Sequence, residues 1–250
     1  MGQSYFTWNG IDCRAMGVWL QDAVAVIRPE ERVEHIQVPG RPGDLTAVEG
    51  DDIYNSYIQT AALMVKGRQN IKEVYQWLRG SGYVSFSEDP DKKQAARIIG
   101  AITLNRYSRN QEWYVGECQF YCQPFKELIT EEPVTVSTNA GASLRNNGDV
   151  EARSMYKLTP SSSTGATVSI TVRRSQNDPV GQKVLTISGL TTYGQPIVID
   201  CDSHEIRNTG RTNWYTPLSS GEFPTLFPGD NYIFGSGWSS VEITKRERYL

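Results

Sequence analysis

The segment 70–97 constrains the fold of this chain most, because it predicts a helix, a glycine stop, a strand and an acidic turn in direct succession. Apolar side chains from Ile71 to Leu78 recur at the spacing of one helical face. Asn70 is expected to cap this helix, because its side-chain oxygen can accept a hydrogen bond from a free backbone N–H. The glycines that follow predict the helix end, and the aromatic and β-branched run 83–86 predicts a strand.

The acidic run Glu88–Asp91 comes directly after this strand. It consists of residues that are typical of turns, and Pro90 fixes its own φ angle. A calcium site would require a loop of alternating oxygen ligands that ends in a distal Glu, and this run lacks one. We therefore interpret the acidic run as a loop that shapes the chain.

The pattern of elements changes near residue 130. Before this point one helix lies among strands, and we expect strands at 5–8, 18–20, 33–38, 52–64, 97–104 and 113–122. After it, turn residues separate short strands, which we expect at 134–137, 168–172, 184–187, 197–200, 232–234 and 241–244. Short strands without helices favour a β-sandwich or jelly roll. A mainly β fold is thus predicted, with an α+β domain at 1–130 and a β-sandwich at 131–250.

The composition excludes several classes of protein. The net charge of −3 and the pI of about 5.5 provide no basic field for nucleic acid. No apolar run approaches the roughly 18 residues of a membrane helix. The N-terminus lacks a basic region followed by an apolar run, so no secretory signal is expected and we expect folding in a cytoplasm. We interpret Cys13, Cys118, Cys122 and Cys201 as buried thiols, because free cysteine behaves as a small hydrophobe.

One set of residues invites a catalytic or metal-binding interpretation. Asp200, Asp202 and His204 alternate along a predicted strand, so they would share one face. No second cluster completes a ligand set, and we expect the solvent face of a sandwich strand. A glycoside hydrolase would need two facing carboxylates about 5–10 Å apart, and no aromatic subsites surround this pair. The other histidine, His35, is expected to be exposed or to lie in an interface.

The sequence carries none of the common catalytic or nucleotide-binding motifs, such as GxSxG, HExxH, a P-loop or GxGxxG. The Gly40–Gly43 loop lacks the Lys and Ser/Thr of a phosphate cradle, so we interpret it as a turn. We therefore predict no catalytic, cofactor-binding or metal-binding residues and no enzymatic activity. An alternative function is a carbohydrate-binding module for host attachment, in which Trp214, Tyr215 or Trp238 would stack on sugar rings.

Five segments resemble, in the same order, motifs of the distal tail proteins of long non-contractile-tailed (siphovirus) bacteriophages. They are Phe6–Ile11 (FTWNGI), Val38–Leu45 (VPGRPGDL), Trp77–Gly82 (WLRGSG) with Phe86–Asp91 (FSEDPD) and Arg97, Phe120–Phe125 (FYCQPF) and Gly221–Asn231 (GEFPTLFPGDN). Together they span nearly the whole chain. Some relatives carry large insertions in the second domain that are linked to sugar binding, and this chain shows none.

The resemblance implies a structural virion protein at the phage tail tip or baseplate, assembled in the host cytoplasm. Its first domain would be a β-barrel-like belt with one helix, closing into a ring of six subunits. Its second would be a galectin-like sandwich outside the ring. The ring would join the tail-tube protein on one face to the tail-associated fibre or lysin protein on the other. DNA would pass through the lumen without sequence-specific binding, and no membrane would be involved.

A ring of this kind needs contacts in which one patch meets a different patch on the neighbour. We expect Trp8, Trp19, Tyr54 and Tyr57 to contribute buried interface contacts, because aromatic side chains are enriched there. A lumen that passes DNA should not be basic, since phosphate contacts would retain the genome. The slight acidic excess of residues 1–130 is compatible with such a lumen.

Overall fold

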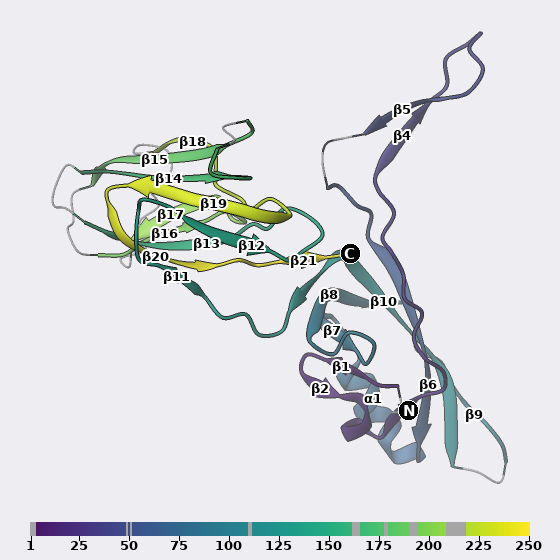
Figure 1. Cartoon of the computed structure of the whole chain (residues 1–250). Helices are drawn as coiled ribbons and strands as arrows, with labels where there is room; N and C mark the ends of the chain where they lie inside the picture. The colour runs from purple at the N-terminus through teal and green to yellow at the C-terminus, as the bar shows by residue number, and fades with distance from the viewer. Residues whose placement is uncertain are drawn as a thin grey trace. The chain divides into compact units, whose positions relative to one another are not determined.

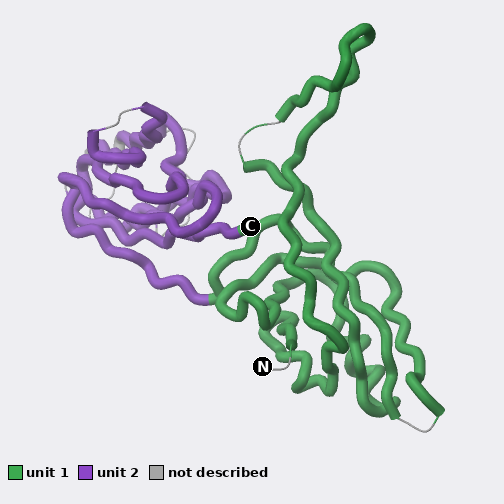
Figure 2. Tube along the Cα trace, turned by 45° about the vertical axis from the view of Figure 1, so that its right-hand side comes forward, with its two compact units in different colours: residues 1–129, 250 green, residues 130–249 purple. Residues whose placement is uncertain are grey.

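The computed structural model describes residues 4–48, 50, 52–109, 112–161, 166–177, 180–190, 195–208 and 219–250. The chain divides into two compact units, which Figure 2 colours separately. Unit 1 comprises residues 1–129 and residue 250, and unit 2 comprises residues 130–249. Each unit has its own cluster of buried apolar side chains.

Unit 1 combines strands with one α-helix. The strands are β1 (Phe6–Trp8), β2 (Ile11–Asp12), β3 (Val18–Leu20), β4 (Val33–Ile36), β5 (Leu45–Val48), β6 (Tyr57–Lys66), β7 (Ser81–Phe86), β8 (Lys92–Ile99), β9 (Leu104–Arg106) and β10 (Trp113–Leu128). The helical elements are the 3-10 helices η1 (Cys13–Met16) and η2 (Arg68–Asn70) and the α-helix α1 (Ile71–Trp77).

The main sheet of unit 1 runs in the order β2-β1-β7-β8-β10-β6-β3, and β9 also pairs with β10. It curls into the barrel-like body that Figure 1 shows around α1. Strand β10 organises the sheet, because it pairs with β6 along one edge and with β8 and β9 along the other. The register between β10 and β8 shifts between Cys122 and Lys126, and a bulge of this kind bends a strand and increases its twist.

Aromatic side chains fill the core of unit 1. The rings of Phe6 and Phe120 meet edge to face with centroids 5.5 Å apart, and Trp8 lies 5.6 Å from Phe120. The last residue of α1, Trp77, stacks on Phe6 at 5.6 Å. The helix also buries Val74 completely. The apolar face predicted for this helix therefore packs into the core.

Asn70 occupies the N-cap position of α1, as predicted, but the capping hydrogen bond predicted for its side chain is absent. Asn70 is the last residue of η2 and already has helical backbone angles, and its side chain makes no capping hydrogen bond. Its Nδ2 instead donates to the backbone oxygen of Lys66 at 2.8 Å. The 3-10 helix in front of α1 moves the start of the helical segment back to Gly67.

The acidic run forms a turn, as predicted, and joins β7 to β8. Strand β8 begins at Lys92, earlier than the strand predicted at 97–104. Its backbone hydrogen bonds run from the Asp89 N–H to the Phe86 oxygen and from the Lys92 N–H to the Asp89 oxygen. The Asp89 carboxylate accepts hydrogen bonds from Lys126 at 2.6 Å and Lys92 at 3.3 Å. These hydrogen bonds, opposed by partial burial, lower the pKa of Asp89. The turn thus anchors two lysines of the sheet.

Unit 2 consists of strands within the residues that the structure describes. They are β11 (Val134–Val136), β12 (Ala142–Asn146), β13 (Met155–Pro160), β14 (Ala166–Arg173), β15 (Lys183–Leu190), β16 (Ile197–Asp200), β17 (Glu205–Asn208), β18 (Ser219–Gly221), β19 (Gly229–Ser236), β20 (Trp238–Thr244) and β21 (Arg248–Tyr249). One sheet has the order β11-β20-β13-β16-β17 and the other the order β12-β19-β14-β15-β18.

The two sheets of unit 2 share one core. Tyr156 and Ile199 of the first sheet and Ile170 and Leu185 of the second belong to the same cluster of buried side chains. Two sheets packed face to face over a shared apolar layer form a β-sandwich. The predicted fold class is therefore confirmed: a mainly β chain with a barrel-like first part that holds one helix, followed by a β-sandwich.

Two further predictions concern thiols and membranes. All four cysteines are free and buried, as predicted. Burial raises the pKa of Cys118 and that of Cys122 to about 12. In the part of the chain that the structure describes, no helix has the length and apolarity needed to cross a membrane.

Candidate assembly interface

A two-stranded hairpin projects from the body of unit 1 (Figure 1). It consists of β4, β5 and the connecting residues 37–44, and we call it the arm. Its strands pair in the register Val33–Val48 to Ile36–Leu45. The tip turns at Gly40 and Gly43, whose φ angles of 81° and 78° lie in the left-handed region that glycine tolerates best. The Gly40–Gly43 segment is thus a turn, as predicted.

Backbone pairing joins the arm to the body of unit 1. Glu31 and Tyr54 form a bridge. The Arg32 N–H donates to the Ile53 oxygen at 2.9 Å, and the Asn55 N–H donates to the Glu30 oxygen at 2.7 Å. The strand predicted at 52–64 consequently begins later, at the start of β6, because the residues before it form the stem of the arm. These backbone contacts fix the two chain segments at the base of the arm.

The arm exposes apolar side chains along its length. Ile36, Val38, Leu45 and Val48 are each between 37% and 50% exposed. Opposed residues of an antiparallel pair share a face, so Val33 and Val48 lie on one face and Ile36 and Leu45 on the other. Neither face is wholly polar. His35 lies on this strand and is exposed, which confirms the prediction for it.

The backbone edges of the arm are also open. Among the described residues, β4 and β5 pair with each other and belong to no larger sheet. An isolated two-stranded hairpin is marginally stable in water, and an open strand edge is a template for pairing with another chain. Together with the exposed apolar side chains, this makes the arm the strongest candidate interface on unit 1.

The outer face of the curled sheet carries a second group of exposed apolar residues. Ile58 lies opposite Tyr121, and Tyr121 lies opposite Arg97 on the next strand. Tyr83 has the same orientation, because it pairs with Ala95, two residues before Arg97. Ile58, Tyr83 and Tyr121 are between 42% and 48% exposed. We call these three residues the outer patch.

The four aromatic residues expected in an interface differ in their exposure. Trp8 is completely buried in the core of unit 1, so its assignment to an interface is wrong. It follows a two-residue alternation in β1 that directs both Phe6 and Trp8 inward. The remaining three are partly buried against their own unit.

Each of these three contacts a residue of unit 1. The rings of Trp19 and Trp113 meet edge to face with centroids 5.3 Å apart, and the ring centroids of Tyr54 and Phe125 are 5.7 Å apart. The Tyr57 hydroxyl donates a hydrogen bond to Gln94 Oε1 at 3.0 Å.

The outer patch had a recognisable signal in the sequence. In β10, Cys118, Phe120 and Cys122 are buried, whereas the residues between them are exposed. Strict alternation of this kind marks one face as core and the other as surface. An aromatic side chain at Tyr121, out of phase with the buried positions, therefore indicates an exposed apolar site.

In unit 2, the structure separates the set Asp200, Asp202 and His204. Strand β16 ends at Asp200, and a turn follows at 201–204, so the three side chains do not share a strand face as predicted. Asp200 causes the turn, because its Oδ1 accepts the N–H groups of Asp202 at 3.0 Å and Ser203 at 3.3 Å. In the described part of the chain, no group of three or more His, Cys, Asp or Glu residues is placed to hold a metal ion.

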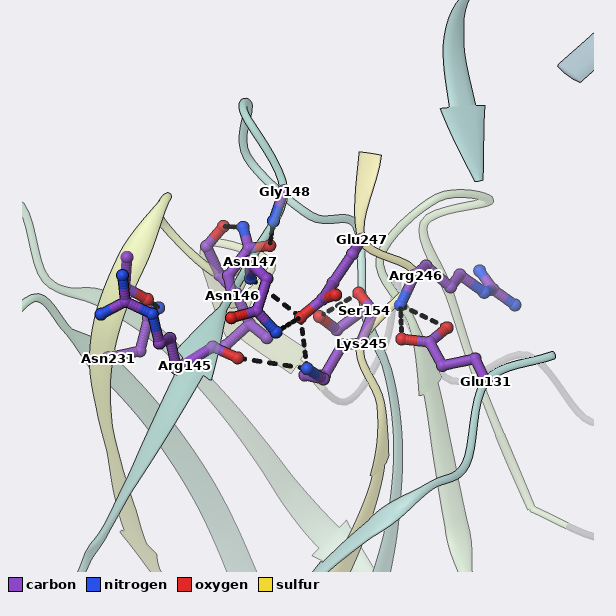
Figure 3. A network of polar contacts seen from close by, with 12 residues as sticks. Glu131, Arg145, Asn146, Asn147, Gly148, Ser154, Asn231, Lys245, Arg246 and Glu247 are labelled. Atoms are coloured by element: carbon purple, nitrogen blue, oxygen red, sulfur yellow. Dashed lines mark hydrogen bonds and ion pairs between the residues drawn. The ribbon is translucent and has the colours of Figure 1, made fainter. Parts of the chain in front are cut away.

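Figure 3 shows a polar network that fixes the C-terminal segment of unit 2, and we call Lys245, Arg246 and Glu247 the C-terminal clasp. The Glu247 carboxylate accepts from the Asn147 backbone N–H at 2.9 Å, from the Lys245 ammonium and from the Tyr249 hydroxyl. Burial raises the pKa of Glu247, but these hydrogen bonds outweigh it and the net pKa is lowered. The clasp therefore holds an ionised carboxylate inside unit 2.

Arg246 extends the clasp to two further acidic residues. Its backbone N–H donates to both carboxylate oxygens of Glu131 at 2.8 Å (Figure 3). Its guanidinium binds the carboxylate of Asp200. Glu131 and Arg246, which lie near the two ends of unit 2, are thus tied to the end of β16.

Of the three aromatic residues of the carbohydrate alternative, the structure describes only Trp238. Trp238 is 1% exposed, and its Nε1 donates to the Ser169 oxygen at 2.9 Å, so its ring belongs to the sandwich core. It therefore cannot offer a face to a sugar. Trp214 and Tyr215 lie outside the described residues.

The comparisons with known proteins identify the fold. No protein-family model matches the sequence, and no curated protein matches it. The fold is similar to that of the Dit protein (gp 19.1) of phage SPP1, with a TM-score of 0.79 and 15% identity over 100% of each chain. That protein is described as a paradigm of the hub adsorption apparatus in phages that infect Gram-positive bacteria. A chain of the activated phage p2 baseplate with Sr is also similar, with a TM-score of 0.48 and 9% identity over 96% of each chain.

Proposed function

We propose that this chain is a distal tail protein of a long non-contractile-tailed bacteriophage. Its subunits would form the hub ring that connects the tail tube to the baseplate or tip. The observation that carries the proposal is the similarity of the whole chain, both units together, to the SPP1 hub protein at a TM-score of 0.79. The ordered motifs from Phe6–Ile11 to Gly221–Asn231 support the same family independently of the fold.

We assign ring formation to unit 1 and infer a hexamer. The arm supports this assignment, because it combines open strand edges with exposed apolar side chains on both faces. A closed ring satisfies such edges on every subunit, since one patch meets a different patch on each neighbour. The outer patch provides the kind of aromatic surface that an arm or a neighbouring tail protein would cover.

The remaining parts of the proposal follow from the hub role. Unit 2 would lie outside the ring, one ring face would bind the tail-tube protein, and the other would bind the tail-associated fibre or lysin protein. The ring would be part of the virion, and DNA would pass through its lumen without being read. We infer a structural, non-enzymatic role.

Light scattering coupled to size-exclusion chromatography tests the proposal. We expect a particle with six times the mass of the 28.0 kDa chain. Because a ring can require its neighbours to close, the measurement is repeated with tail-tube or fibre protein from the same phage. A chain that stays monomeric in both measurements contradicts the proposed ring.

A further inference from the structure

An open groove runs beside α1 on the surface of unit 1, and we call it the helix groove. Residues of η2, of α1 and of the segment directly after α1 line it: Arg68, Ile71, Lys72, Tyr75, Gln76 and Arg79. Residues three or four positions apart are neighbours on a helix surface, so these side chains form one stripe. The groove opens widely to solvent, which suits a segment of another protein better than a small enclosed ligand.

The helix groove is lined by three cations and by no acidic residue. The cations are Arg68, Lys72 and Arg79, and all three are exposed. In the part of the chain that the structure describes, none of the three forms an ion pair with an acidic residue. Complementary charge selects partners and repels surfaces of the same sign. The groove therefore favours a partner that carries several carboxylates.

The helix groove also offers apolar contact between its cations. Tyr75 is 42% exposed, and Ile71 is half-buried against the core of unit 1. Tyrosine and arginine are enriched in protein interfaces relative to other surfaces. The partner should thus combine carboxylates with at least one apolar side chain.

A segment of this composition lies at the base of the arm. Residues 30–34 (EERVE), which we call the acidic segment, run from the stem into β4. Glu30, Glu31 and Glu34 are exposed, and none of them has an ion pair within the residues described. The acidic segment thus carries three free carboxylates around one valine.

The charge and length of the acidic segment match those of the helix groove. The one cation of the segment, Arg32, is engaged within the stem, because its Nε donates to Asn55 Oδ1 at 3.1 Å. An extended chain advances about 3.3 Å per residue, so the three carboxylates spread over about 13 Å. A helix advances about 1.5 Å per residue, so the three cations of the groove spread over about 17 Å. Three charges of each sign can therefore pair over a similar distance.

Such a contact must join two copies of the chain. The helix groove is lined only by residues 68–79, so the acidic segment of the same chain does not cover it. Figure 1 shows that the arm extends away from α1 within unit 1. Two different patches that complement each other produce a contact that closes into a ring when the rotation between copies allows it.

We propose that the acidic segment of one copy binds the helix groove of a neighbouring copy. Its three carboxylates lie among the three cations of the groove, and Val33 lies near Tyr75. This inference rests on the proposed ring and names the surface that receives the base of the arm. The exposed apolar side chains farther along the arm are not part of this contact.

Charge reversal on each side tests the contact in the full-length chain. The readout is the concentration at which half of the chain is assembled, from light scattering of a dilution series. Lys72→Glu with Arg79→Glu should raise this concentration at least tenfold, because close charge pairs across an interface contribute to affinity. Glu31→Lys with Glu34→Lys should have the same effect. The variant with all four changes has reversed charges on both sides of every contact, and it should return to within about threefold of the native value.

Controls separate this contact from a general effect of charge. Arg153→Glu with Lys157→Glu changes the net charge of the chain equally, at exposed cations of unit 2, and should leave assembly unchanged. Urea unfolding checks that each variant is folded. At 1 M salt the Debye length is about 3 Å, so the difference between the native chain and the groove variant should shrink.

Carbodiimide coupling provides a second readout, because it joins a carboxylate to an amine in direct contact. In a mixture of isotope-labelled and unlabelled native chain, it should link Lys72 of one copy to Glu30, Glu31 or Glu34 of another. Restored assembly in the four-change variant together with this link supports the proposal. Normal assembly of the groove variant, no recovery in the four-change variant, or no such link would overturn the contact and leave the ring intact. A native chain that stays monomeric, alone and with tail-tube protein, would overturn both.

Discussion

The guanidinium of Arg246 binds the carboxylate of Asp200 through two hydrogen bonds, from Nη1 to Oδ1 at 2.7 Å and from Nη2 to Oδ2 at 3.0 Å. The same carboxylate oxygen Oδ1 closes the turn after β16. One acidic residue therefore ends a strand and holds the C-terminal clasp. Charge-assisted bidentate contacts of this kind are among the stronger polar interactions in proteins.

Replacing Asp200 with Asn should destabilise unit 2. The substitution removes the charge that Arg246 and two backbone N–H groups contact, and a hydrogen bond to a charged group contributes about 1.5–3 kcal/mol. We expect the free energy of unfolding to fall by about 2 kcal/mol in urea. Asp202→Asn is the matched control, because its pair with Arg153 is exposed and should contribute less than about 1 kcal/mol. Equal effects of the two substitutions would contradict the assigned role of Asp200.

The clasp should make unit 2 sensitive to acid. Burial raises the pKa of Glu247, but hydrogen bonds from Asn147, Lys245 and Tyr249 outweigh burial, so the net pKa is lowered. A carboxylate with a lowered folded pKa contributes stability above its unfolded pKa of about 4.3, and this contribution is lost as the pH falls through the folded value. Urea unfolding should therefore show a plateau of stability above about pH 5 and a decline below about pH 4.

The variant Glu247→Gln isolates this contribution. It should lower the free energy of unfolding by about 1–2 kcal/mol at pH 7, and its stability should decline less between pH 5 and pH 3 than that of the native chain. A variant that loses stability in parallel with the native chain over this range would show that Glu247 is not the titrating group.

The thiols should be unreactive in the folded chain. All four are buried, burial raises the pKa of Cys118 and of Cys122 to about 12, and only the thiolate is nucleophilic. Titration with a thiol reagent at pH 8 should detect no fast reaction in buffer and four thiols in urea. A cysteine that reacts rapidly without denaturant would contradict its burial.

Charges on the arm should prevent assembly without unfolding the chain. In the variant Ile36→Asp with Leu45→Asp, both changes lie on one face of the arm, opposite each other. We expect the oligomer to dissociate, because like charges would be buried in the interface, while the free energy of unfolding changes by no more than about 0.5 kcal/mol. Val180→Asp, at an exposed valine of unit 2, is the control. Normal assembly of the double variant would exclude the arm from the interface.

Secondary-structure elements were predicted correctly where the sequence has a clear hydrophobic periodicity. The apolar face of α1 and the strand Ile197–Asp200 were found because local pattern and tertiary packing agree there. Strand β13 was missed, although Tyr156 and Leu158 alternate with polar residues and face the core. The strand also contains Lys157 and Pro160, which are less typical of strands and obscure the two-residue period.

The errors at the candidate sites have tertiary causes. The sequence cannot show that a 3-10 helix precedes α1 and gives Asn70 helical backbone angles, and the side chain of Asn70 makes no capping hydrogen bond there. The turn after Asp200 is local, because its Oδ1 accepts the N–H groups of Asp202 and Ser203. The contact of Asp200 with Arg246 could not be read from the sequence, because the two residues are distant along the chain. Trp8 was assigned to an interface for its residue type alone, whereas its position within β1 directs it into the core.

The central claim is that this chain forms a hub ring through unit 1. Electron microscopy of the purified protein, alone and with tail-tube protein, tests it most directly. The account predicts class averages with six-fold symmetry and a central lumen, and the loss of these rings in the Ile36→Asp, Leu45→Asp variant. Particles without six-fold symmetry in both samples, or rings that persist in this variant, would contradict it.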